Sequence, residues 1–330
     1  MKKQLLRLAA LPRSLLHLQL LRENDVQPDV ILYRDDALKG LFTAEEQTRS
    51  LYLGRELRPS PGRFIQSFRY NRRYYGGVEA TLRDLDIETL IIFLEGEPLE
   101  RFIVETKLAR NFQLWEDGLS HYVDLTSSTY YKARGIAQAL CGFYPKGITQ
   151  RRVDRSRFQI FDRFEQKNLR WTYPPRPQSK RPEILLIGSP LVEDRLIGRK
   201  AFRRGLEAVA GATPLTIRYL LHPRENLRRL QEDLAPYPLI AIEADRRGVM
   251  RHVADWDYLA YVSAVSTAIL DIGRPSHSIF VPALFELKQP ARAISQWRMS
   301  PVSSAKEVGE LSLLLKNLTQ FPYSSPSTNS

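Results

Sequence analysis

Short apolar runs alternate with amphipathic stretches along most of the chain. Residues 26–33 and 89–94 hold consecutive apolar side chains, a pattern typical of strands that are buried on both faces. Such runs predict strands at 3–9, 26–33, 89–94, 111–114, 183–187, 215–221, 239–242, 258–262 and 278–281. Helical spacing predicts helices at 15–21, 97–109, 196–210, 224–234 and 304–319, one within 40–80 that ends before Gly76, one that starts near 263–267, and helices or a small hairpin within 125–172. Strands that alternate with helices indicate an α/β protein with parallel sheets.

A proline-rich stretch interrupts this alternation. The ten residues from Tyr173 to Pro182 include four prolines and show no apolar period, so they predict a linker. A length of 330 residues also favours two domains over a single core. We therefore expect one Rossmann-like domain at 1–175 and a second at 183–330.

The chain is strongly basic, with a formal net charge of +12. Nucleic acid, an anionic membrane surface or an anionic small ligand could each explain this charge. Apart from a cluster at 151–157 the basic residues are spread out, and no zinc-finger spacing, basic-region heptad or aromatic ribonucleoprotein motif accompanies them. These absences argue against nucleic acid and leave an anionic membrane surface as a candidate partner.

Cysteine usage and hydropathy indicate a location. One cysteine, Cys141, excludes an internal disulfide and is typical of a reducing cytoplasm. No apolar run reaches the roughly 18 residues that a membrane-spanning helix needs. The leucines after Lys3 resemble an export signal, but Arg7 and Pro12 break the run, which we interpret as a first strand. The expected location is the cytoplasm, with the protein peripheral on the inner membrane.

Several common catalytic signatures are absent from the sequence. It contains no Walker A loop, no G-x-G-x-x-G, no G-x-S-x-G and no H-E-x-x-H. Two Asp-x-Asp pairs occur, Asp84-Leu85-Asp86 and Asp255-Trp256-Asp257, a pattern that can hold a diphosphate through a cation. The first pair precedes a strand, where Asp is a common loop residue, and the second has no further acids nearby. We therefore expect no metal site.

Three predicted strand ends carry polar residues. They are Glu116-Asp117-Gly118, His222-Pro223 and Ser266-Thr267. Ligands of open α/β sheets bind at the carboxyl ends of the strands, which favours a functional role. Each group also has an ordinary explanation: acids in a turn, a loop histidine, and a helix N-cap. Their order and their distribution over both predicted domains favour function.

In this order the three groups resemble the motifs of a family. Bacterial sialyltransferases, which include the lipooligosaccharide sialyltransferases and the capsule polysialyltransferases, carry a D/E-D/E-G motif, a His-Pro motif and a later Ser-Ser/Thr motif. The resemblance covers the chain from the first strand to about Ile279. It implies a GT-B fold, in which two Rossmann-like domains face each other across a cleft. Residues 1–175 would then bind the acceptor, and 183–330 the nucleotide sugar.

The resemblance also implies a reaction. Sialic acid, or a related nonulosonic acid, would pass with inversion from a CMP donor to a surface glycan or glycolipid such as lipooligosaccharide or capsule. Asp117 would take the proton of the acceptor hydroxyl, with its neighbour Glu116 as the alternative base. His222 would protonate the departing phosphate or hydrogen-bond to it. A CMP donor has one phosphate, so the expected reaction needs no cofactor and no metal.

Further residues would contact the substrates. By the same resemblance these are Gly118, Ser189, Pro190, Pro223, Ser266 and Thr267. The Ser-Thr pair would bind phosphate oxygens together with the helix N-terminus that follows it. The base on one domain and the leaving-group contacts on the other would form a site completed by domain closure.

Some alternatives stay open at this stage. Asp194, in the loop after the strand at 183–187, is a rival base. Related enzymes of the same group transfer glucose from a UDP donor, so another nucleotide sugar is an alternative substrate. A protein that binds a polyanion or glycan without catalysis is a third reading. The sequence does not indicate an oligomeric state.

Overall fold

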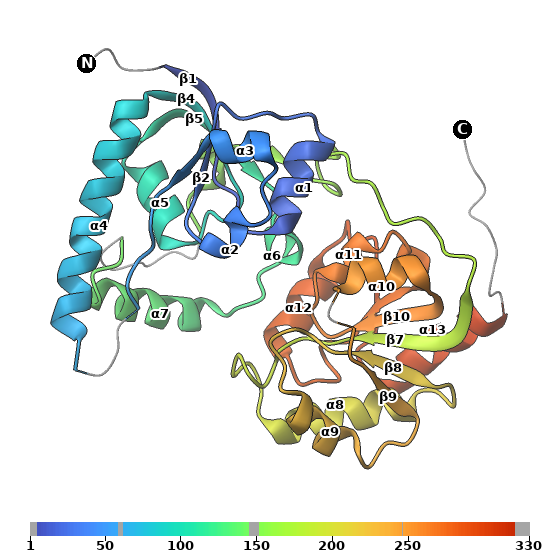
Figure 1. The fold of residues 1–330 in the computed structure, drawn as a ribbon. Coiled ribbons are helices and arrows are strands. Elements are labelled where there is room, and N and C mark those ends of the chain that lie inside the picture. Colours follow the sequence, from blue (N-terminus) through green and yellow to red (C-terminus); the bar gives the residue numbers. More distant parts are fainter. Residues whose placement is uncertain (1–4, 59–61, 145–151, 246, 321–330) are drawn as a thin grey trace. The chain divides into compact units, whose positions relative to one another are not determined.

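The computed structural model describes residues 5–58, 62–144, 152–245 and 247–320 (Figure 1). The chain divides into two compact units. Unit 1 comprises Met1–Asp117 and Thr126–Thr172, and unit 2 comprises Gly118–Leu125 and Tyr173–Ser330. The predicted start of the first strand, at residues 3 and 4, and Arg151 of the basic cluster lie outside the described residues.

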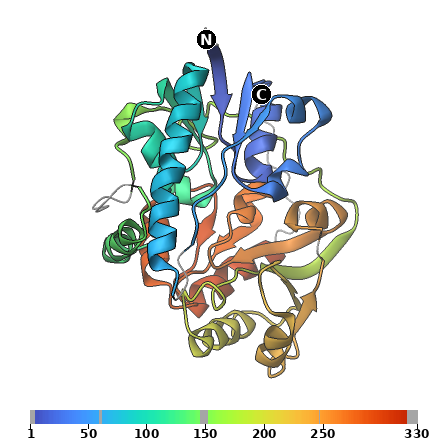
Figure 2. The ribbon, with the colours of Figure 1, turned by 60° about the vertical axis from the view of Figure 1, so that its left-hand side comes forward.

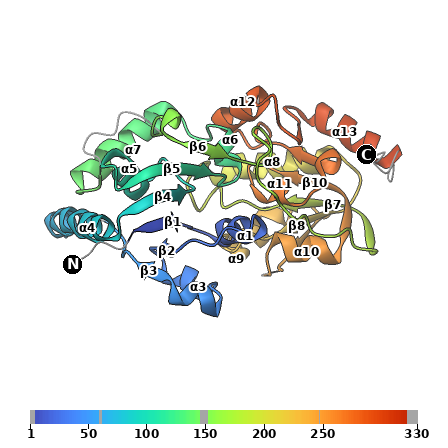
Figure 3. The same ribbon diagram turned by 90° about the horizontal axis from the view of Figure 1, so that it is seen from above.

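Unit 1 is built on one parallel sheet of six strands. Its strands are β1 (Leu6–Ala10), β2 (Val30–Tyr33), β3 (Ser50–Tyr52), β4 (Ile87–Ile92), β5 (Ala109–Trp115) and β6 (Gln159–Phe161). They lie in the order β3-β2-β1-β4-β5-β6 (Figure 3), and every pair is parallel. This is the Rossmann strand order, in which the direction of winding reverses between β1 and β4.

Helices cover both faces of this sheet. The helices of unit 1 are α1 (Leu15–Glu23), α2 (Asp36–Lys39), α3 (Ala44–Thr48), α4 (Phe64–Leu85), α5 (Pro98–Glu105) and α7 (Ser128–Leu140), with a short 3-10 turn at Arg155–Arg157. Helix α4 runs along one face of the sheet (Figure 2). Leu90 of β4 packs in one core with Leu82 of this helix and Phe102 of α5. Its neighbour Ile91 packs on the other face with Leu20 of α1. Because successive strand residues face opposite sides, a fully apolar strand such as β4 is buried on both.

Unit 2 repeats the same topology. Its strands are β7 (Lys180–Ile187), β8 (Ile217–Leu220), β9 (Ile240–Glu243), β10 (Asp257–Ser263), β11 (Ser278–Phe280) and β12 (Ser303–Ser304), in the order β12-β11-β10-β7-β8-β9. Numbered from β7, these strands again follow the Rossmann order, with the reversal between β7 and β10. Leu186, Phe202 and Leu311 share the core on one face, which α8 (Arg199–Gly211), α9 (Leu227–Leu234) and α13 (Val308–Gln320) cover.

The remaining helices of unit 2 are shorter. They are α6 (Leu119–Tyr122), α10 (Val249–Asp255), α11 (Ala268–Asp271) and α12 (Lys288–Gln296), with a 3-10 turn at Pro275–His277. In the described part of the chain, no helix is both long and apolar enough to cross a membrane.

The predicted fold class, α/β with two Rossmann-like domains, is confirmed. The predicted ranges 1–175 and 183–330 are not tested as independent domains, and by contact the segment Gly118–Leu125 belongs with unit 2. Strand β7 already begins at Lys180, inside the stretch that the prolines indicated as a linker.

One local prediction was wrong, and of the helices or small hairpin predicted for 125–172 the structure shows helix α7. Helix α4 does not end before Gly76 but continues to Leu85. It buries Tyr75, Val78 and Leu82 along one face, and this burial outweighs the cost of roughly 1 kcal/mol that a helical glycine carries. The small hairpin considered for 125–172 is not formed by the described residues, since β6 joins the sheet as a parallel edge strand beside β5.

Candidate functional site

The points where the strand order reverses indicate which loops are best placed to bind a ligand. In an open α/β sheet the loops after the two central strands diverge there and leave room at the carboxyl edge. In unit 1 these loops follow β1 and β4, and in unit 2 they follow β7 and β10. The loop after β5 is adjacent to that of β4, and the loop after β8 is adjacent to that of β7.

Asp117 ends the first segment of unit 1, just after β5, and a buried histidine orients its carboxylate. His17 Nε2 lies 2.7 Å from Asp117 Oδ1. The backbone N–H of Arg13 donates to His17 Nδ1 at 2.9 Å, so the neutral ring carries its proton on Nε2 and donates it to Asp117. The His17 ring stacks on Phe93 at 4.0 Å between centroids, which fixes its plane. The Asp117 side chain stays 22% exposed and can therefore reach a substrate.

Glu116 has a different environment from Asp117. Its side chain is fully buried, and Arg163 binds it through two nitrogens, with Nη2–Oε1 at 2.5 Å and Nε–Oε2 at 2.9 Å. The backbone N–H of Arg163 also donates to Oε2 at 3.1 Å. The guanidinium of Arg163 in turn lies over the ring of Trp171, at 4.8 Å. A carboxylate held in this way joins β5 to the segment after β6 and is poorly placed to take a proton from a substrate.

Gly118 is the first residue of the segment that packs with unit 2. Its φ of +97° lies in the left-handed region that favours glycine. A Cβ built on it would come within 2.1 Å of Cγ2 of Thr267, so there is no space for a larger residue. The next backbone N–H, that of Leu119, donates to Oγ1 of Thr267 at 3.2 Å. Gly118 and Thr267, two predicted substrate contacts, therefore touch each other.

Further contacts fasten Gly118–Leu125 within unit 2. The ring of Tyr122 stacks on Trp297, with 4.6 Å between centroids and 16° between planes. Gln289 donates through Nε2 to the carbonyl of Asp124 at 3.1 Å. The D/E-D/E-G motif is thus split: its acids belong to unit 1 and its glycine to unit 2.

The loop after β7 begins with Gly188-Ser189-Pro190. A Cβ on Gly188 would lie 2.5 Å from Oε2 of Glu225 and 2.6 Å from the carbonyl of Leu220, so the two loops approach too closely for a side chain. Oγ of Ser189 is buried and has no hydrogen-bond partner among the described residues. Pro190 accepts through its carbonyl from the N–H of Asp194 at 2.8 Å, which closes the turn.

His222 lies just after β8 and is half-buried. The backbone N–H of Arg224 donates to its Nδ1 at 3.1 Å, which leaves the proton of the neutral ring on Nε2. Burial, and after it the positive charge of Arg224, holds the pKa of His222 below its usual value. His222 is therefore neutral near pH 7 and suited to donate a hydrogen bond. Pro223, between these two residues, is exposed.

Glu225 is buried beside the loop that carries His222 and accepts a hydrogen bond from it. Its Oε2 accepts the backbone N–H of His222 at 2.9 Å, and its Oε1 accepts the hydroxyl of Tyr219 at 2.6 Å. Burial raises the pKa of Glu225 to about 7. The sequence analysis gave no role to this residue, although it lies only two positions after Pro223.

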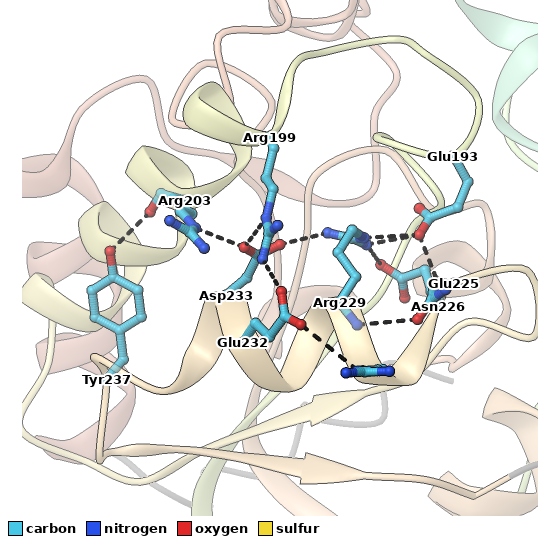
Figure 4. Close-up of polar contacts among 10 residues, drawn as sticks. Glu193, Arg199, Arg203, Glu225, Asn226, Arg229, Glu232, Asp233 and Tyr237 are labelled. Carbon is cyan, nitrogen blue, oxygen red and sulfur yellow. Dashed lines mark hydrogen bonds and ion pairs between the residues drawn. The ribbon is translucent and has the colours of Figure 1, made fainter.

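An ion network continues from this loop into α8 and α9 (Figure 4). Arg229 binds Oε1 of Glu193 and Oδ2 of Asp233, at 2.9 Å and 2.8 Å. Arg199 and Arg203 both donate to Oδ1 of Asp233, at 2.5 Å and 2.6 Å. The network fixes the loops after β7 and β8 to the helices that cover the sheet.

The rival base Asp194 and the Ser-Thr pair also have defined partners. Asp194 Oδ1 lies 2.8 Å from Nη1 of Arg224, so its carboxylate is paired with a cation. Ser266 donates its backbone N–H to Oγ of Ser263 at 2.9 Å. Helix α11 after the pair has only four residues, and Thr267 makes no side-chain cap to it. So short a helix has little dipole, and the predicted contribution of its N-terminus to phosphate binding stays a prediction.

Within the described ranges, no group of three or more His, Cys, Asp or Glu side chains is placed to hold a metal ion. The sequence predictions also missed His17 and Arg13. His17 was hidden in a leucine-rich helix, and its only signal was a polar ring at a position that faces the core.

No protein-family model matches this chain, and no curated protein is similar to it in sequence. Solved structures are similar in fold at low identity. CalG4, the calicheamicin glycosyltransferase, matches with 13% identity and a TM-score of 0.45, over 96% of this chain and 90% of its own. MurG of Acinetobacter baumannii matches with 9% identity and a TM-score of 0.47, over 96% of this chain and 91% of its own. UDP-GlcNAc 2-epimerase from Methanocaldococcus jannaschii matches with 12% identity and a TM-score of 0.43, over 95% of this chain and 99% of its own. Likenesses at this level assign neither a donor nor an acceptor to this chain.

Proposed function

We propose that this protein is an inverting, metal-independent glycosyltransferase. It moves sialic acid or a related nonulosonic acid from a CMP donor to an acceptor hydroxyl on a cell-surface glycan. The observation that carries the proposal is the carboxylate of Asp117, which the buried ring of His17 orients at the carboxyl edge of unit 1 while part of the carboxylate stays exposed.

In the proposed reaction Asp117 is the base. The acceptor oxygen attacks the anomeric carbon, its proton passes to Asp117, and the bond from that carbon to the phosphate oxygen of CMP breaks. CMP leaves with the bonding electrons, and the configuration inverts. A hydrogen bond from His17 keeps Oδ1 of this carboxylate in place, and the side chain is 22% exposed. Glu116 is a weaker candidate because Arg163 occupies both of its oxygens.

Unit 2 would bind the donor through the loops after β7, β8 and β10. His222 would donate a hydrogen bond from Nε2 to an oxygen of the leaving phosphate. Its lowered pKa keeps the ring neutral near pH 7, so the ring holds no second proton to transfer. Ser189, Ser266 and Thr267 would offer hydroxyls or backbone N–H groups nearby. A single phosphate needs few cations, so we propose that EDTA leaves the activity unchanged.

The net charge of +12 supports a further part of the proposal, that the protein works at an anionic inner-membrane surface on its cytoplasmic side. Binding to vesicles with and without anionic lipid, compared at two salt concentrations, tests this location.

Nucleotide binding tests the donor. A ligand that binds only the folded protein raises the melting temperature, by an amount that grows with the ratio of its concentration to its Kd. We expect CMP to stabilise the full chain more than UDP or CDP at equal concentration. Stabilisation by UDP but not by CMP would contradict the proposal of a CMP-sialic acid donor and favour another nucleotide sugar. Stabilisation by none of the three, together with binding of glycan, would favour a protein that binds glycans without catalysis.

A further inference from the structure

An arginine-rich pocket lies within unit 1. It has a volume of about 990 Å³ and opens at the carboxyl ends of β1, β2, β3 and β4. Its lining includes five arginines: Arg13, Arg34, Arg55, Arg58 and Arg134. Three carboxylates, those of Asp35, Glu56 and Glu97, line it as well. The pocket therefore occupies the edge of the sheet where ligands of such folds bind, and its cations outnumber its acids.

Two of these arginines are fixed by buried acids. Arg13 binds Glu100 through Nε and Nη2, at 2.5 Å and 2.8 Å, and the side chain of Glu100 is fully buried. Arg34 pairs with Glu56, whose side chain is also buried. Such pairs hold each guanidinium in one orientation, so the positive charges of Arg13 and Arg34 are in place before a ligand binds.

The two fixed guanidiniums also act on each other. Burial, and after it the positive charge of Arg13, lowers the pKa of Arg34. Nε of Arg34 is buried and has no hydrogen-bond partner in the described chain. An anion in the pocket would reduce the repulsion between Arg13 and Arg34, so these two side chains favour a negatively charged ligand.

Two further arginines supply charge that no acid offsets. Arg55 and Arg58 follow β3, are exposed, and form no ion pair with any residue that the structure describes. Arg134 of α7 is different, because it lies 3.2 Å from Glu97. The excess of positive charge in the pocket thus comes mainly from the loop after β3.

Arg13 connects the pocket to the proposed base. Its side chain lines the pocket, while its backbone N–H donates to His17, and His17 donates to Asp117. One short loop after β1 therefore shapes the pocket and orients the carboxylate. A ligand held by Arg13 would lie on the same sheet edge as the base, within unit 1.

We propose that this pocket binds an acidic group of the acceptor, a carboxylate or a phosphate on a sugar. The assignment rests on the proposed function, which it deepens by naming an anionic acceptor. Guanidinium groups recognise both acids through paired N–H donors, so the shared chemistry is an oxyanion with at least two acceptor oxygens.

The test is direct binding to the full chain without donor, by calorimetry at one fixed ionic strength. The probes are methyl β-glucuronide for a carboxylate, glucose 6-phosphate for a phosphate, and methyl β-glucoside as the neutral match. The main variant is Arg55→Gln with Arg58→Gln, since both side chains are exposed and their loss leaves no buried acid unpaired. The control is Arg72→Gln with Arg73→Gln, which removes the same charge from exposed positions of α4 outside the pocket lining.

We expect at least one acidic sugar to bind and the neutral sugar not to bind. The affinity for the acidic sugar should fall about tenfold or more in the Arg55/Arg58 variant and stay unchanged in the control. Preference for the glucuronide or for the phosphate tells which acid the pocket takes. Equal losses in variant and control, equal binding of the neutral sugar, or no binding of either acidic sugar would overturn the proposal.

The same proteins separate this proposal from the proposed function. If CMP stabilises the wild type and the Arg55/Arg58 variant alike, the donor site is intact and any loss concerns the pocket. A loss of CMP stabilisation in that variant would instead make the pocket a donor site and overturn the assignment to the acceptor. If CMP has no effect on the wild type, the proposed function fails. The binding of acidic sugars then still shows whether the pocket binds an oxyanion.

Discussion

The carboxyl edges of the two sheets share one strand order but carry opposite kinds of polar chemistry. In unit 1 the loops present guanidinium groups and a carboxylate, among them Arg13, Arg34 and Asp117. In unit 2 the loops after β7 and β8 present the glycine and hydroxyl of Gly188-Ser189 and the uncharged imidazole of His222, and their charged groups Asp194 and Arg224 are paired with each other. The difference teaches that the Rossmann order supplies only the position of the edge, and that the loops decide what the edge can bind.

The two edges also stabilise their buried acids in different ways. In unit 1 the buried Glu116 pairs with Arg163 and the buried Glu100 with Arg13. In unit 2 the hydrogen bonds to the buried Glu225 come from neutral donors, and Arg229 lies 4.0 Å from its Oε1. Burial raises the pKa of Glu225 to about 7. Unit 1 thus keeps fixed charges near its base, whereas unit 2 has an acid that changes charge near neutral pH.

The largest effect should come from Asp117→Asn. The amide cannot take a proton, so we expect transfer to fall by roughly a hundredfold to ten-thousandfold. The amide still accepts a hydrogen bond from His17, so the melting temperature and the stabilisation by CMP should stay near those of the wild type. Transfer rates with a CMP-activated donor measure the first effect. Retained transfer would move the base to Glu116 or to Asp194.

Glu116→Gln sharpens the contrast between the two neighbouring acids. It leaves Arg163 buried without its carboxylate, and breaking a buried pair costs about 4 kcal/mol. Chemical denaturation followed by circular dichroism should show this loss in unit 1. The exposed pair of Arg83 with Glu79 is the control, since Glu79→Gln should change stability by less than about 1 kcal/mol. A stable Glu116→Gln protein that lacks activity would instead indicate a direct role in catalysis.

Gly118→Ala tests the junction at which the chain enters unit 2. The positive φ and the approach to Thr267 Cγ2 should together cost about 3 kcal/mol. Serine lacks this methyl group, so Thr267→Ser should restore part of the loss in the double variant while Oγ can still accept from Leu119. A double-mutant cycle on the free energy of unfolding measures the coupling. Simple additivity would show that backbone strain alone accounts for the cost.

The sequence was enough to predict the alternating strands and helices, because apolar runs and helical spacing report local burial. The sequence could not show which of the two acids, Glu116 or Asp117, is better placed to act as the base. The partner of Glu116 is 47 positions away in Arg163, and that of Asp117 is 100 positions away in His17. Neither contact leaves a local pattern. The packing of Gly118–Leu125 with unit 2 was missed for the same reason, since Thr267 and Trp297 lie far along the chain.

The smallest effect concerns the acid of unit 2. The folded-state pKa of Glu225 is about 7, above its ordinary value of 4.5, so the folded chain keeps this proton where the unfolded chain has lost it. The stability that Glu225 contributes is therefore full below about pH 4.5 and is lost as pH rises to about 7, a change of at most about 3 kcal/mol. Glu225→Gln removes this titration, so the difference in melting temperature between wild type and variant should change over that range and be flat above it. Glu207→Gln, at an exposed position of α8, is the control for the loss of one carboxylate. If the difference for Glu225→Gln varies with pH no more than that of the control, burial does not raise the pKa of Glu225, and the contrast between the two buried acids fails.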